Sequence, residues 1–314
     1  MNFAPRAWSD CGVPPPGAAL AMMISCRAPL LLRRFPVLMK EASFNELEDE
    51  GALLVKVSVL ASSSSGNSTL VATERTRLLV DAGLSRKETF ERLNAAGTAP
   101  ESLTAILVTH EHSDHIAGLH TIAKKLDIPI YVSRLTAPAI FGEGTQWAEQ
   151  SYAPKLEMFA AGSCFTVGDI DVTSFTIPHD AADPVGFSFQ AEGIKVGIAT
   201  DLGYMPDSIR FHLRGCDLLL LESNHDLNML KVGSYPWALK QRIMGRNGHL
   251  SNDVACSFIR EDMDSRTSTL ILGHLSAHNN HPVLVRQAAV EALGAKSTKL
   301  VVAEPAQPTE TFHY

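Results

Sequence analysis

The protein has 314 residues, 45% of them hydrophobic, and a formal net charge of −7 at pH 7. A chain of this length can form one or two domains with a substantial core. The negative charge excludes a general electrostatic attraction to nucleic acid or to anionic membranes. No run of about 18 uninterrupted apolar residues is present, so we expect no membrane partner. Scattered cysteines without a CxxC pair indicate a reduced, cytoplasmic protein.

The first 52 residues differ in composition from the rest. They contain a proline run starting at Pro14 and an apolar run that Arg27 interrupts, and they lack a clean signal-peptide cleavage site. We therefore expect residues 1–52 to be a disordered or mis-annotated N-terminal extension, with Met39 as an alternative start. Residues 53–314 are expected to form one domain.

From residue 53 the chain alternates short apolar runs with turn signals. Runs rich in β-branched residues predict strands, and apolar residues at helical spacing predict helices. In the first half, the expected strands are Val55–Leu60, Thr69–Val71, Leu78–Val80, Leu103–Val108 and Ile130–Val132, and the expected helices are Arg86–Ala96 and His115–Leu126.

The second half starts with another block of strands and then alternates strands with helices. Two such halves predict two sheets packed together and covered by helices on both outer faces. The expected strands are Phe165–Val167, Ile170–Ile177, Val185–Gln190, Lys195–Ala199, Leu218–Leu221, Leu270–Leu272 and Leu300–Val302, and the expected helices are Pro206–Leu213, Trp237–Met244, Asp253–Ile259 and Val283–Leu293.

A run of histidines and acidic residues, His110-Glu111-His112-Ser113-Asp114-His115, follows the expected strand Leu103–Val108. In extended backbone His110 and His112 project to the same side, so they can bind one metal ion. Asp114 and His115 begin the next helix and point differently, as a second ion requires. Imidazole nitrogens and a carboxylate suit Zn²⁺ or Mn²⁺. The motif therefore predicts a metal centre.

Six consecutive residues cannot complete two coordination shells, so further ligands must come from elsewhere. His179, Asp201 and His274 each follow an expected strand, where loops converge. Each of them alone is more often a capping or surface residue. Their placement after the motif makes them the expected remaining ligands.

The ordered pattern HxHxDH, then His, Asp and His, resembles the metallo-β-lactamase superfamily, from Leu53 to Val302. The resemblance implies the metallo-β-lactamase fold, an α+β four-layer αββα sandwich of two mixed sheets flanked by helices. It also implies two divalent ions, Zn or Mn with Fe as a further option. One ion would be held by His110, His112 and His179, the other by Asp114, His115 and His274, with Asp201 bridging.

Five further segments are similar to the YycJ (WalJ) group of this superfamily: Ala61–Ser68, Leu79–Gly83, Leu221–Asp226, Gly248–Asn252 and His274–Asn280. This resemblance implies a metal-dependent 5′-to-3′ DNA exonuclease that uses a metal-bridged hydroxide, with DNA rather than RNA as substrate. Asp114 is then also a catalytic candidate, because it can orient the attacking water or accept its proton. His249 lies where ribonuclease Z relatives keep a histidine that can protonate the leaving oxygen, although a structural role is equally open.

Other residues are candidates for substrate binding or for bracing the ligands. The turn containing Ser64, Ser65, Gly66 and Asn67 either holds phosphate oxygens or is an ordinary hairpin turn. The expected substrate-binding residues also include Asn279 and Asn280 after His274. Asp81, Glu222 and His225 are expected to lie behind the ligands, as braces or caps, although a core or rim position is favoured for His225.

The segment from Leu227 to Asn252 is basic and has no acidic residue. Lys231, Lys240, Arg242 and Arg246 supply its charge, and the last three are expected to contact phosphate. The alternative is a solvated helix face. Tyr235 or Trp237 can stack on a base, although core burial is the expected fate of Trp237.

Two other activities remain open. A small-molecule or cyclic-nucleotide phosphodiesterase would use the same metal ligands. A thioesterase or lactamase is less favoured, since no basic helical patch for a carrier such as Coenzyme A is evident.

Overall fold

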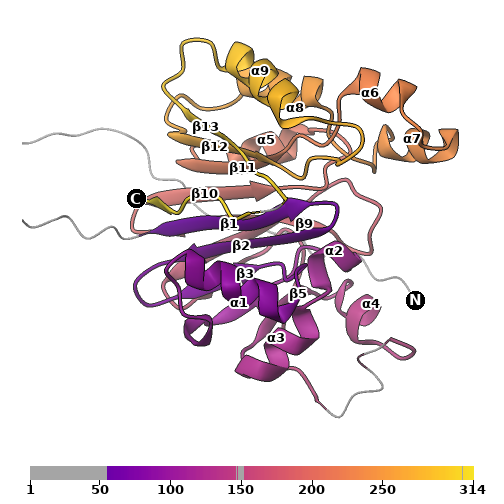
Figure 1. Ribbon diagram of the computed structural model, residues 1–314. Helices are drawn as coiled ribbons and strands as arrows, with labels where there is room; N and C mark the ends of the chain where they lie inside the picture. The colour runs from indigo at the N-terminus through magenta and orange to yellow at the C-terminus, as the bar shows by residue number, and fades with distance from the viewer. Residues whose placement is uncertain (1–54, 146, 148–151, 306) are drawn as a thin grey trace, which may run out of the picture. The chain divides into compact units, whose positions relative to one another are not determined.

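In the residues that the structure describes, two sheets of seven strands pack face to face, and helices cover the outer side of each (Figure 1). The computed structural model describes residues 55–145, 147, 152–305 and 307–314. The predicted extension, residues 1–52, and the predicted start of the domain at residue 53 lie outside them. The four-layer arrangement confirms the predicted metallo-β-lactamase fold.

The first sheet is antiparallel at one edge and parallel at the other. The C-terminal strand β14 joins the antiparallel edge, so the chain returns to the first sheet after completing the second. The strands in spatial order are β14 (Phe312–His313), β1 (Lys56–Ser63), β2 (Gly66–Ala72), β3 (Arg77–Val80), β4 (Ala105–Leu107), β5 (Ile130–Ser133) and β6 (Leu156–Phe159).

The second sheet is also mixed, with parallel pairing from β13 to β10 and antiparallel pairing from β10 to β7. Parallel strands end at the same edge of a sheet, so their following loops gather there. The strands in spatial order are β13 (Lys299–Val302), β12 (Thr269–Gly273), β11 (Leu218–Glu222), β10 (Ile194–Ala199), β9 (Val185–Ala191), β8 (Ile170–Thr176) and β7 (Cys164–Val167).

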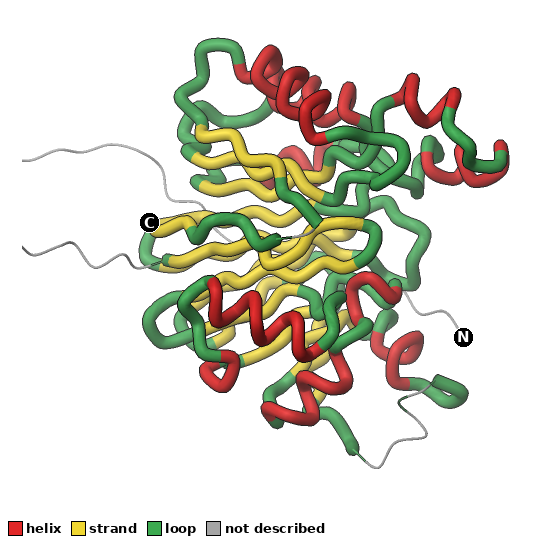
Figure 2. Tube along the Cα trace, in the orientation of Figure 1, coloured by secondary structure: helices red, strands yellow, loops and turns green. Residues whose placement is uncertain are grey.

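Helices form the two outer layers (Figure 2). On the first sheet lie α1 (Arg86–Ala95), α3 (Leu119–Leu126) and α4 (Ala137–Phe141), and on the second lie α5 (Asp207–Leu213), α8 (Asn252–Glu261) and α9 (Pro282–Leu293). The short helices α2 (Ser113–Ile116), α6 (Leu227–Val232) and α7 (Trp237–Ile243) and the 3-10 turn Pro100–Ser102 complete the described elements.

Three apolar clusters hold these layers together. One lies between the sheets and includes Val59, Phe187 and Ile271. The other two lie between each sheet and its helices. Full burial of a large apolar side chain contributes about 1.5–3 kcal/mol, so these clusters supply most of the driving force for folding.

The predicted continuous helix His115–Leu126 is wrong, because the structure breaks it into α2 and α3. Gly118 lies at the break. A Cβ at this position would lie 2.0 Å from the carbonyl oxygen of Leu84, and the Gly118 N–H donates to the carbonyl of Ala82 at 2.8 Å. This close backbone packing turns the chain and separates α2, with its metal motif, from the supporting helix α3.

Several short elements were not predicted: α4, α6, β6 and β14. Each is only two to six residues long in the structure, so periodicity had little sequence on which to act. No described helix combines the length and the apolar character needed to cross a bilayer.

Candidate metal centre

The predicted ligands come from loops that follow strands of both sheets. The HEHSDH motif follows β4, His179 follows β8, Asp201 follows β10 and His274 follows β12. Two contacts join the sheets here, since Ser63 forms a parallel bridge with Leu275 and the His274 N–H donates to Ser62 Oγ at 2.8 Å. The loops therefore meet at one edge of the sandwich.

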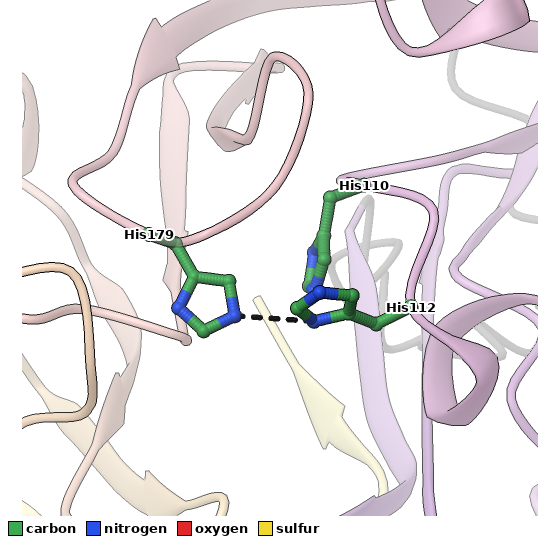
Figure 3. A group of neighbouring side chains, drawn as sticks. All are labelled: His110, His112 and His179. Atoms are coloured by element: carbon green, nitrogen blue, oxygen red, sulfur yellow. Dashed lines mark hydrogen bonds between the residues drawn. The ribbon is translucent and has the colours of Figure 1, made fainter. Parts of the chain in front are cut away.

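Three histidines form the first group, as Figure 3 shows. His110 is fully buried in the loop after β4, His112 lies in the same loop, and His179 faces them from the loop after β8. His179 Nε2 lies 3.2 Å from His112 Nδ1. The donor nitrogens of all three lie within 4.8 Å of one another, so one cation can contact all of them.

A second group lies beside the first and contains Asp114, His115 and His274. Asp201 lies between the groups. Its Oδ2 is 3.3 Å from His115 Nε2, and its Oδ1 is 3.5 Å from His274 Nε2 and 3.8 Å from His179 Nε2. The structure therefore brings all seven predicted ligands together.

The donor set fits divalent metal. His110 Nε2, His274 Nε2 and Asp201 Oδ2 are buried without a hydrogen-bond partner, which is costly unless something else satisfies them. All three face their groups, and nitrogen and carboxylate donors are those that Zn²⁺ and Mn²⁺ accept. These His and Asp clusters are suited to binding divalent metal.

Buried carboxylates hold the opposite nitrogens of two ligands. Asp81 Oδ2 accepts from His115 Nδ1 at 2.8 Å, and Glu222 Oε1 accepts from His274 Nδ1 at 2.9 Å. Each bond turns Nε2 of its histidine towards the cluster. The expected bracing positions of Asp81 and Glu222 therefore match the geometry.

Glu222 also braces His249, whose Nδ1 lies 2.8 Å from the same oxygen. Burial raises the pKa of the Glu222 carboxyl, but the charges and hydrogen bonds of His249 and His274 together outweigh it and lower that pKa to about 2. Burial lowers the pKa of His249, but the charge and the hydrogen bond of Glu222 together outweigh it, so that the pKa is raised. Glu222 therefore favours the protonated form of the partly exposed His249 ring.

Backbone strain is concentrated at the site. Asp81, Asp201 and His274 have φ of 60°, 61° and 56°, in the left-handed region. Each is the first or second residue after a strand. Residues other than glycine are uncommon in the left-handed region. Such strain persists when the surrounding structure fixes the residue for a function.

A pocket of about 230 Å³ opens beside the clusters. The predicted residues that line it are Ser64, Tyr235, Arg242 and His249, together with five of the predicted ligands. Asn67 does not line the pocket. It lies behind the predicted ligands, and its Nδ2 donates to Asp114 Oδ2 at 3.2 Å. Ser65 is exposed at the hairpin turn next to Ser64, and Gly66 is buried at the start of β2.

Like Asn67, three further predicted substrate-binding residues are buried outside the pocket, and these four predictions are corrected. Lys240 is buried, and its Nζ donates to the carbonyls of Lys231 and Gly233 at the end of α6. Asn280 is buried and bonds Ser223 and Asn252. Asn279 is 1% exposed, so neither asparagine is available to substrate.

His225 takes the core position that the sequence favoured rather than a place beside a ligand, and Trp237 differs from expectation. His225 is buried away from the pocket, and burial lowers its pKa to about 4. Trp237, expected in the core, is 63% exposed on α7.

Three polar residues of the pocket were not predicted: Asp180, Asn224 and Ser276. Asp180 directly follows His179, and Asn224 and Ser276 lie in segments that resemble relatives. Asp180 accepts a hydrogen bond from Arg242 Nε at 2.6 Å. Its position beside a ligand was the available signal.

Comparison with known proteins agrees with the fold. The β-lactamase superfamily domain matches residues 76–274. The crystal structure of the metallo-β-lactamase fold protein YhfI from Bacillus subtilis superposes with a TM-score of 0.61 at 19% identity, covering 83% of this chain and 99% of that one. Fold and clusters together define a member of the metallo-β-lactamase superfamily.

Two curated relatives are much more similar in sequence. Exodeoxyribonuclease YycJ of Bacillus anthracis is 39% identical over 240 residues, which are 76% of this chain and 89% of the relative. Exodeoxyribonuclease WalJ of Streptococcus pneumoniae serotype 2 is 40% identical over 244 residues, 76% of this chain and 90% of the relative. The chain belongs to the YycJ/WalJ family, which confirms the resemblance seen in its motifs.

Proposed function

We propose that this protein is a two-metal phosphodiester hydrolase that removes nucleotides from the 5′ end of DNA. The observation that carries the proposal is the convergence of seven ligand side chains with orphaned buried donor atoms. The similarity to curated exodeoxyribonucleases over most of their length supports DNA as the substrate.

In this proposal the two groups hold separate ions, Zn²⁺ or Mn²⁺. His110 and His274 present Nε2, as the buried orphaned atoms indicate, and Asp201 reaches towards both groups. A pair of divalent ions would supply Lewis acidity to a phosphodiester and lower the pKa of water towards neutrality.

The chain's own residues position the proton transfers. Asp114 is one-fifth exposed and faces the pocket, so its carboxylate can orient the attacking water. His249, held by Glu222 and favoured in its protonated form, donates a proton to the leaving oxygen. Ser64 at the rim offers a hydroxyl to a phosphate oxygen.

A substrate panel tests the proposal. The full chain, loaded with Mn²⁺ or Zn²⁺, is incubated with end-labelled single- and double-stranded DNA, RNA, a cyclic nucleotide and a thioester. We expect mononucleotides to be released from the 5′ end of DNA. Intact DNA together with cleavage of the cyclic nucleotide would show that the protein is a small-molecule phosphodiesterase instead.

Ligand variants test the role of the clusters. His110→Ala and Asp114→Ala should each reduce kcat by at least about 100-fold, with the circular dichroism spectrum unchanged. Metal content is measured on the same samples by elemental analysis. Full activity in either variant would contradict the assigned roles.

A further inference from the structure

The basic segment before His249 separates into two parts in the structure. Lys240 points inward and caps α6, whereas Arg242 and Arg246 are exposed. Both arginines line a hollow of about 470 Å³ next to the metal pocket, together with Asp180, Gly245 and Asn247. Two exposed cationic side chains of the segment therefore lie beside one hollow next to the metal centre, whereas the exposed Lys231 lines neither space.

Arg242 belongs to both spaces, since it also lines the metal pocket. Apart from histidines it is the only cationic side chain among the described residues there, where Asp114, Asp180 and Asp201 also face inward. Asp180 engages its Nε, and no described protein acceptor engages its terminal nitrogens. Those N–H groups can bind a phosphate oxygen pair.

Arg246 lines the second hollow but not the metal pocket, and its neighbours hold it in place. Its guanidinium carbon lies 4.1 Å from the centre of the Tyr204 ring. A Cβ on Gly203 would lie 1.9 Å from the carbonyl oxygen of Arg246. Because Gly203 follows the Asp201 loop, Arg246 is fixed relative to the metal centre.

We propose that Arg242 and Arg246 bind the phosphates that follow the scissile phosphate on the same DNA strand, and that these contacts select a polynucleotide over a small phosphodiester. The inference rests on the proposed function and adds the path of the strand. A guanidinium matches phosphate geometry through paired N–H donors. Arg242 also offsets the charge of Asp180, which would otherwise repel the strand.

Binding of a labelled single-stranded 12-mer tests this path directly, by fluorescence anisotropy of the full chain at several salt concentrations. Arg242→Ala and Arg246→Ala should each weaken binding by about tenfold and reduce the slope of log K against log salt by about 0.7. Arg242→Lys should keep the slope while recovering part of the affinity. Arg260→Ala, an exposed arginine in the last turn of α8, is the matched control and should change neither.

Catalysis gives the second readout. For the metal-loaded protein, the ratio of kcat/KM for the 12-mer to that for bis(p-nitrophenyl) phosphate should fall about tenfold in each alanine variant, mainly through KM. Unchanged salt slopes, or equal weakening by Arg260→Ala, would overturn the phosphate path. Bound DNA that stays uncleaved with metal present would overturn the proposed function but leave the path intact.

Discussion

Single carboxylates determine how the histidines at this site are oriented. Asp81 accepts three hydrogen bonds, from the Thr109 N–H at 2.8 Å, from Thr109 Oγ1 at 2.9 Å and from His115 Nδ1 at 2.8 Å. It therefore fixes both the start of the HEHSDH loop and one ring within it. The left-handed backbone at Asp81 places the carboxylate for this purpose.

Asp81→Asn should weaken metal binding about 10- to 100-fold, as loss of a brace behind a metal ligand commonly does. Asparagine tolerates the left-handed conformation, but its amide group replaces an acceptor for His115 Nδ1. Metal affinity is measured by competition with a chromogenic chelator. Asp127→Asn, at a left-handed residue far along the chain at the end of α3, is the control, and equal affinity in both variants would contradict the role of Asp81.

The sequence allowed a good prediction of the residues around the metal groups but not of the outer binding residues. Ligand types and their positions after strands are local features, so the sequence alone singles out His179, Asp201 and His274 as candidates. The burial of Lys240 depends on the carbonyls of α6, and that of Asn280 depends on Ser223 and Asn252. Such contacts depend on how distant segments pack, which spacing does not reveal.

Among the elements, the break between α2 and α3 shows where periodicity failed. Apolar spacing continues through Gly118, so the sequence predicted one helix. The backbone of Leu84 approaches too closely for a straight helix with a side chain at this position. Longer elements such as α8 and α9 were predicted to within two residues at each end because their apolar faces extend over several turns.

Gly118→Ala should destabilise the fold by about 1–3 kcal/mol, because the new methyl group meets backbone that cannot move aside easily. It should also weaken metal binding, since α2 carries Asp114 and His115. Urea unfolding and chelator competition measure the two effects, with Ala117→Ser as a neighbouring exposed control. An unchanged unfolding midpoint would show that α2 can shift without cost.

For the whole domain, the two predicted metal groups combine side chains that follow strands of both sheets. Asp114 and His115 come from the first sheet, and Asp201 and His274 come from the second. A ligand that binds only the folded state stabilises it by about 2.7 kcal/mol at a concentration 100 times its Kd. Bound metal should therefore stabilise the sandwich as a unit.

Removing metal with a chelator should lower the melting temperature by about 5 °C or more. Adding back Mn²⁺ or Zn²⁺ should restore it, and the His110→Ala variant should respond less than the wild type. Differential scanning calorimetry with elemental analysis of each sample checks this. An equal melting temperature for metal-free and metal-loaded protein would contradict the expectation that bound metal stabilises the packing of the two sheets.

Asp169 joins the two sheets through their hairpin turns. It lies in the β7–β8 turn, and its carboxylate accepts from Thr73 Oγ1 at 2.9 Å and from Arg75 Nε at 3.2 Å, both in the β2–β3 turn. The Asp169 N–H donates to Thr76 Oγ1 at 3.3 Å. Burial raises the pKa of Asp169, but the hydrogen bonds of Thr76, Thr73 and Arg75 outweigh it, so that pKa lies below 3.8.

Folding lowers the pKa of Asp169, so the unfolded chain binds more protons than the folded chain at a pH between the two pKa values. The stabilisation by Asp169 is therefore complete above pH 3.8, its unfolded value, and is lost as the pH falls through the lower folded value. Asp169→Asn should lower the free energy of unfolding at neutral pH by about 1–3 kcal/mol and flatten its acid dependence. Urea unfolding from neutral pH downward measures both, and nuclease activity at neutral pH should not change, because Asp169 lies outside the pocket. Coincident acid-stability curves for wild type and variant would show that this link contributes nothing to the pairing of the sheets.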